Sequence, residues 1–77
     1  MRRLGTVVRT RGDVLVVRAA AGDPPDIGTM AIDESLETVG RVVDVFGPTE
    51  HPYLAVSPID SIAAASLLQD TLYWRPD

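Results

Sequence analysis

The sequence predicts an all-β fold, a small six-stranded β-barrel with one short helical connection, in a single domain over residues 1–77. Runs of valine and other strand-forming residues recur along the chain, with glycine, proline or aspartate between them. The chain of 77 residues contains no cysteine, so disulfides cannot support its small core. Closing the sheet into a barrel removes exposed strand edges without extra residues, and we therefore expect that architecture.

Six segments carry the strand pattern. We expect strands at 4–10, 13–20, 27–32, 39–46, 53–57 and 71–75. A turn at Arg11-Gly12 joins the first two into a hairpin, because glycine tolerates the positive φ of a tight turn. This explains Arg11-Gly12-Asp13 better than the cell-adhesion motif that the tripeptide also matches. In the fifth strand Leu54 and Val56 share one face, which we assign to the core.

The helical connection is expected at residues 61–68. Their sequence, Ser-Ile-Ala-Ala-Ala-Ser-Leu-Leu, predicts a helix of about two turns, a length that is marginal in isolation. We expect Asp60 or Ser61 to cap this helix. The side chains expected to hold it on the barrel are Ile62, Leu67 and Leu68.

The charges make non-specific nucleic-acid binding improbable. All seven basic residues are arginine, and eleven acidic residues give a formal net charge of −4. Phosphate affinity depends on clustered cations, which an acidic chain provides poorly. The first hairpin holds Arg2, Arg3, Arg9, Arg11 and Arg18; we interpret them as its solvent face, paired with the surplus of carboxylates, rather than as an RNA-binding strip. The same composition fits a high-GC or salt-adapted source.

Residues for catalysis are few. His51 is the single histidine, and no serine and carboxylate accompany it in the pattern of a hydrolase. The three carboxylates within 33–38 lack histidine neighbours and regular spacing, so a solvated turn explains them better than a metal site. The sequence therefore predicts no enzyme, no cofactor and no small-molecule substrate. No apolar run approaches the ~20 residues of a membrane span, so we expect a cytoplasmic protein.

One stretch has the chemistry of a recognition loop. The valine-rich strand 39–46 ends at Gly47-Pro48, and the next strand begins after Pro52. The two prolines restrict φ at both ends of the connection, which lowers the conformational entropy lost when it docks on a partner. Phe46 and Tyr53 border this loop, so its surface is apolar and largely preformed.

Three segments resemble the archaeal Gar subunit family of H/ACA ribonucleoproteins, the complexes that pseudouridylate RNA. They are Met-Arg-Arg-Leu-Gly-Thr-Val at 1–7, Val-Gly-Arg-Val-Val-Asp-Val-Phe-Gly-Pro at 39–48, and Pro-Tyr-Leu-Ala-Val at 52–56 followed by Pro58. The spacing between Phe-Gly-Pro and Pro-Tyr is the most specific part, whereas Val-Gly-x-Val also occurs in unrelated small barrels. Residues 70–73 resemble the closing strand of the family. Gln69 stands where the family often has glycine.

The resemblance implies a six-stranded barrel without catalytic activity that binds the catalytic domain of a dyskerin-like pseudouridine synthase. It also implies an influence on the mobile thumb loop of that subunit, which promotes substrate RNA loading and release. The H/ACA guide RNA would be contacted mostly indirectly. An aspartate of the partner would isomerise uridine in rRNA.

Carried over to this chain, the resemblance places the partner contact at Phe46, Gly47, Pro48, Pro52 and Tyr53. Phe46 and Tyr53 would supply apolar area, and Gly47 would permit the turn. As the only phenylalanine, Phe46 could instead fill the barrel core. A function of another class is a stand-alone PRC-type or OB-like barrel that binds a ribosomal protein or an RNA surface. That alternative leaves the loop between Phe46 and Tyr53 without a role.

Overall fold

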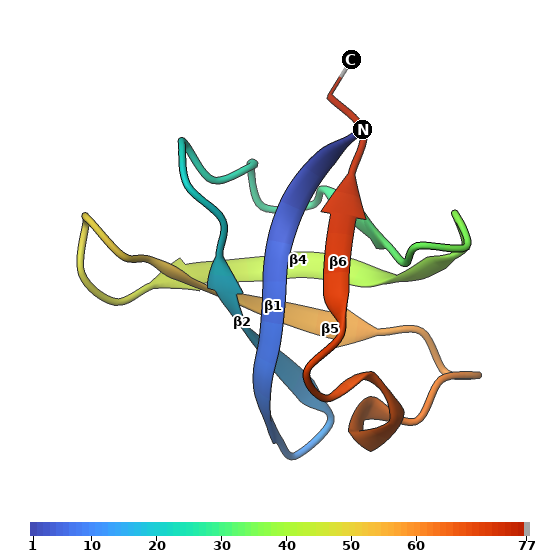
Figure 1. Cartoon of the computed structure of the whole chain (residues 1–77). Helices are drawn as coiled ribbons and strands as arrows, with labels where there is room; N and C mark the ends of the chain where they lie inside the picture. Colours follow the sequence, from blue (N-terminus) through green and yellow to red (C-terminus); the bar gives the residue numbers. More distant parts are fainter. Residues whose placement is uncertain (77) are drawn as a thin grey trace.

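The chain forms a closed barrel of six antiparallel strands, which confirms the fold class predicted from the sequence (Figure 1). The computed structural model describes residues 1–76. Its elements are β1 (Arg2–Arg11), β2 (Val14–Ala19), β3 (Met30–Ile32), β4 (Thr38–Phe46), β5 (Tyr53–Pro58), the 3₁₀ turn η1 (Ala64–Leu67) and β6 (Thr71–Trp74). No helix in the described part of the chain has the length and apolar character needed to cross a membrane.

The strand order around the barrel is β1-β2-β5-β4-β3-β6, and β6 pairs with β1 to close it. Two hairpins, β1–β2 and β4–β5, lie side by side because β2 pairs with β5. The predicted turn of the first hairpin is confirmed, since Gly12 has a φ of +61°. The short β3 completes the ring by pairing with both β4 and β6.

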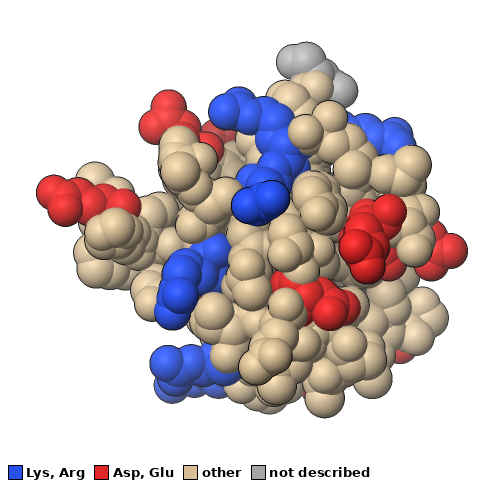
Figure 2. Space-filling model, viewed as in Figure 1, with Lys and Arg blue, Asp and Glu red and all other residues tan. Residues whose placement is uncertain are grey.

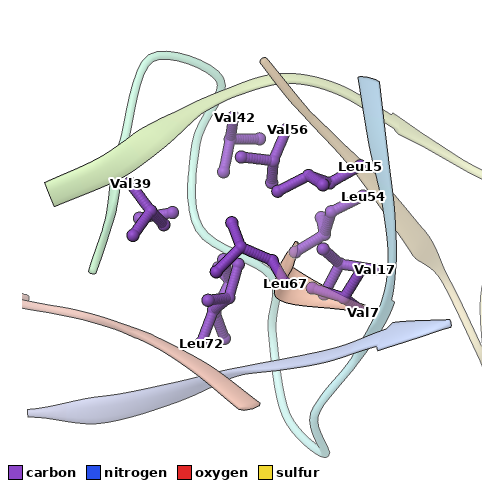
Figure 3. Close-up of a cluster of buried hydrophobic side chains, with 11 residues drawn as sticks. Val7, Leu15, Val17, Val39, Val42, Leu54, Val56, Leu67 and Leu72 are labelled. Carbon is purple, nitrogen blue, oxygen red and sulfur yellow. The ribbon is translucent and has the colours of Figure 1, made fainter. Parts of the chain in front are cut away.

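The core follows from the two-residue period of the strands. Inward-facing aliphatic side chains from the six strands and η1 meet in one cluster (Figure 3). Its buried members are Leu4, Val7, Leu15, Val17, Ala31, Val39, Val42, Leu54, Val56, Leu67 and Leu72. The predicted core positions Leu54 and Val56 are both fully buried, whereas no polar side chain is buried among the described residues. Apolar packing alone therefore fills the barrel.

The predicted short helical connection is present as a single 3₁₀ turn, whereas the helix of about two turns predicted over 61–68 is wrong. Only Ala64–Leu67 form a 3₁₀ turn, preceded by Ala63 with no side-chain cap, so the capping roles given to Asp60 and Ser61 are wrong too. Leu67 is buried and Ile62 packs against the core, but Leu68 is 46% exposed. The Gln69 N–H donates to the Val7 carbonyl at 2.7 Å. This bond holds the end of the segment against β1.

The third strand is shorter than expected. Strand geometry begins at Met30 rather than at Ile27, because Gly28 has a φ of +99° and the Thr29 N–H donates to the Asp26 carbonyl in a turn. The turn still bonds to β4, where the Gly28 N–H donates to the Val42 carbonyl at 2.7 Å. Residues 27–29 thus remain bonded to β4 and extend the wall of the barrel, but they do not form a regular strand.

Candidate partner-binding surface

The β4–β5 hairpin carries the candidate site at one end of the barrel. Its connection, residues 47–52, projects to the left in Figure 1 and is exposed except for the half-buried Pro52. Phe46 pairs with Tyr53, and Val45 pairs with Leu54, so the ladder continues to the start of the loop. The structure therefore brings together the five residues predicted for the partner contact.

Phe46 does not fill the core. Its side chain is 42% exposed and lies against the ring of Tyr53, with ring centroids 5.9 Å apart and an interplanar angle of 23°. This is an offset stacked pair across two strands, a geometry that favours aromatic contact. Tyr53 is half-buried, so the pair is partly covered and partly open to solvent. The alternative in which Phe46 fills the barrel core is therefore wrong. The stacked pair instead presents an apolar surface to solvent.

The loop is fixed at both ends. Gly47 has a φ of +90°, as predicted for the residue that permits the turn, and a Cβ there would lie 3.1 Å from Cδ1 of Tyr53. The His51 N–H donates to the Pro48 carbonyl at 3.2 Å, which closes a turn inside the loop. The Ala19 N–H donates to the Pro52 carbonyl at 3.1 Å, which ties the second end to β2. With two prolines between these points, the loop has little conformational freedom to lose.

A groove of about 640 Å³ runs between this loop and the connection after β2. Residues 45–52 line one wall and residues 18–24 line the other. Alanine, glycine and proline make up much of the lining, with charged groups at Arg18, Asp23 and Glu50. Such a groove can accept an extended segment or a protruding side chain of another protein.

His51 and Ser57, the histidine and a serine of the next strand, lie apart in the structure. His51 is exposed in the loop, and Ser57 lies near the far end of β5. The four residue steps of strand from Tyr53 to Ser57 span roughly 13 Å, so the histidine and the serine are held well apart. Within residues 1–76, no group of three or more histidine and carboxylate side chains is arranged to hold a metal ion.

A second apolar surface lies around β3 and β6, which stand across the barrel from β2 and β5. Met30 is 48% exposed and Leu36 is 55% exposed, and they border a hollow that also contains Trp74. The guanidinium carbon of Arg2 lies 5.7 Å from the Trp74 ring centroid, a cation–π contact. Sequence reasoning missed this surface because its members come from three separate segments, and only the strand register brings them together.

The carboxylates predicted to form a solvated turn do so. The Asp33 Oδ1 accepts the N–H groups of Ser35 at 2.8 Å and Glu37 at 3.1 Å. This pattern is an aspartate-stabilised turn, in which the carboxylate serves the backbone. The turn leaves Leu36 with a φ of +69°, an unusual conformation for leucine.

Comparison with known proteins found neither a protein-family model nor a curated protein that matches this chain.

Proposed function

We propose that this chain is a non-catalytic subunit of an H/ACA guide ribonucleoprotein. In this proposal it binds the pseudouridine synthase subunit and assists substrate RNA loading and release during rRNA pseudouridylation. The resemblance of residues 1–7, 39–48 and 52–56 to the Gar family suggests the complex. The six-stranded barrel is the architecture that this resemblance implied.

The exposed Phe46–Tyr53 pair is the observation that carries the proposal. A small domain gains stability by burying its aromatic rings, yet the only phenylalanine is on the outside and stacked on a tyrosine. Preorganised aromatic residues in a partly covered patch are typical of the residues that contribute most to protein–protein affinity. The fixed backbone on both sides of the loop favours binding further, because little entropy is lost.

The test is a calorimetric titration of the chain with the dyskerin-like synthase of the same organism, without RNA and at its physiological salt. A stoichiometric complex is expected. The double variant Pro48→Ala/Tyr53→Ala should weaken it by at least about tenfold, or about 1.4 kcal/mol, because it removes ring contact and loosens the loop.

Tyr73→Ala is the matched control, since it removes the same ring from β6, which lies on the other side of the strand order. We expect it to leave the affinity within about twofold, while the circular dichroism spectra of both variants keep the strand signal. Wild-type chain that shows no binding well above micromolar concentration contradicts the subunit proposal. The stand-alone barrel, tested next by RNA pull-down, would then replace it.

A further inference from the structure

Beyond the loop, the strand register aligns outward-facing residues across four strands. Thr6 pairs with Arg18, Arg18 with Tyr53, and Tyr53 with Phe46. These residues form one row over β1, β2, β5 and β4, and Arg18 also lines the groove beside the loop. The aromatic pair is therefore the end of a longer outward row that begins with polar and basic side chains.

A second row follows the first. Arg9 pairs with Val16, Val16 with Ala55, and Ala55 with Asp44. Arg11, which pairs with Val14, continues the same outer face, and a shallow hollow of about 320 Å³ lies over its centre. The hollow is lined by Arg11, Val14, Val16, Asp44, Phe46 and Ala55, and its surface is mainly apolar.

We call this surface the arginine face and define it by these two rows with Arg11 and Val14. It has an aliphatic centre, an aromatic end on β4 and β5, and three arginines along β1 and β2. Asp44 is its one acidic residue, and its Oδ1 accepts the Val45 N–H at 2.8 Å; three arginines against one carboxylate leave a positive balance. The face is thus basic on a chain whose formal net charge is −4.

The surface view shows where the charged side chains lie around this face. Figure 2 shows blue arginine areas in the upper middle and down the left of the view, over β1 and the strand beside it, and a further blue area at the upper right. Red carboxylate areas lie on the right of the same view and also at the loop tips on the left, next to the arginines. An acidic group on an approaching surface is therefore attracted to the arginines of this face.

The composition favours a protein rather than single-stranded nucleic acid. Single-stranded nucleic acids need several aromatic planes open to successive bases together with a continuous cationic track. Here Phe46 and Tyr53 stack on each other, Arg18 pairs with Tyr53, and valine and alanine line the hollow between Phe46 and Arg11. An aliphatic centre with arginine and aromatic residues around it is instead the usual composition of a protein interface.

We propose that the arginine face, and not the loop alone, receives the partner, and that the partner surface is apolar at its centre and carries carboxylates opposite Arg9, Arg11 and Arg18. This inference rests on the proposed function, in which that partner is the pseudouridine synthase. The carboxylates select and orient the complex, and the Phe46–Tyr53 pair supplies the apolar contact beside them. A closed barrel offers few unpaired strand edges, so recognition through outward side chains is the route that the fold leaves open.

The experiment measures binding of the full chain to the synthase, without RNA, for two charge-reversal variants. Arg9→Glu/Arg18→Glu changes the arginine face. Arg41→Glu/Arg75→Glu makes the same change in net charge near Met30, on the other side of the strand order. All four arginines are exposed, so both variants should keep the fold, and thermal melts check this.

The face variant should weaken binding at least about tenfold at about 0.1 M salt, mainly through slower association, and the deficit should shrink towards about 1 M. The control variant should remain within about twofold of wild type. If the face variant does not fold, Arg9→Gln/Arg18→Gln tests the same point, with about half the effect expected.

Three results would overturn the inference, and they are distinguishable. A complex that responds to Pro48→Ala/Tyr53→Ala but not to Arg9→Glu/Arg18→Glu leaves the proposed function standing and confines the contact to the loop. Absence of any complex contradicts the proposed function and the inference together. Submicromolar binding of the chain alone to a short single-stranded oligoribonucleotide, abolished in the face variant, would reassign the arginine face to RNA.

Discussion

The two faces of the β4–β5 hairpin use the same strands for different purposes. Leu54 faces inward and is fully buried, whereas its neighbour Tyr53 faces outward and stacks on Phe46. The inward residues contact aliphatic side chains from all around the barrel (Figure 3), and the outward ones contact each other, solvent and the groove. One residue step along a strand thus separates a position needed for folding from a position available for recognition.

The difference teaches that this barrel does not need its outward aromatic residues for closure. The core is complete with aliphatic side chains, and within the described residues it buries no polar group. Residues on the outer face can therefore change without leaving a cavity, and selection for a partner is free to act on them. Stability and binding should respond to different substitutions in the same hairpin.

The largest effect is expected for Leu54→Ala. Truncating a fully buried leucine should lower the free energy of unfolding by about 2–5 kcal/mol, since it removes apolar contacts and leaves a cavity in the barrel centre. Tyr53→Ala, one position away, should cost less than about 1.5 kcal/mol, because the ring is only half-buried. Urea unfolding monitored by circular dichroism measures both values.

These two variants also test whether the inward and outward residues of the hairpin have different roles. An equal loss of stability in Tyr53→Ala would show that the stacked pair belongs to the folding core. Binding to the synthase adds a second readout at temperatures where both variants are folded. Tyr53→Ala should weaken the complex, whereas Leu54→Ala should change it little.

A smaller effect is expected for Gly47→Ala. With a φ of +90°, alanine there should cost about 1–2 kcal/mol of stability, and its Cβ would press on the Tyr53 ring, 3.1 Å from Cδ1. Gly28→Ala is the matched control, because Gly28 has a φ of +99° but no atom near the position of the added Cβ. Both should lose stability by thermal melting, Gly47→Ala the more because of the added contact with the ring, and only Gly47→Ala should also weaken synthase binding. Equal synthase affinity in the two variants would mean that the position of the Tyr53 ring does not matter for binding.

The alternation of apolar residues was enough to predict the barrel and the inward positions. Leu54 and Val56 follow from a period of two, and Gly47-Pro48 marks the end of β4 without reference to tertiary structure. The prediction of a helix at 61–68 failed because it used only the local alanine content and included no tertiary contact of that segment. In the fold, the bond from Gln69 to Val7 decides the path of that segment, and no local pattern contains it.

The candidate site was likewise predicted only in part. The loop was predicted because its glycine, prolines and aromatic residues are adjacent in sequence. The arginine face was missed, and the arginines of β1 and β2 were interpreted only as a solvent surface. The register between β1, β2 and β5, including the bulge between Val7 and Arg9, places Arg9, Arg18 and Tyr53 on one outer face. No single strand sequence contains that register.

The smallest effect, and the sharpest test of which outer surface binds, is expected for Leu36→Gly. Leucine with a φ of +69° costs roughly 1–2 kcal/mol relative to an unstrained position, and its side chain is 55% exposed, so little packing is lost with it. Glycine should therefore raise stability by up to about 1 kcal/mol, or about 4–8 °C in Tm for a domain of this size.

Leu36 also tests the assignment of the partner to the β4–β5 side. It is an exposed apolar residue in the hollow with Met30 and Trp74, away from the arginine face, so Leu36→Gly should leave synthase affinity unchanged while the melting temperature rises. A variant that is more stable yet binds the synthase more weakly would show that Leu36 contacts the partner despite its strained backbone. The partner would then sit on the Met30 side of the barrel, because strain in an exposed residue persists where function requires it.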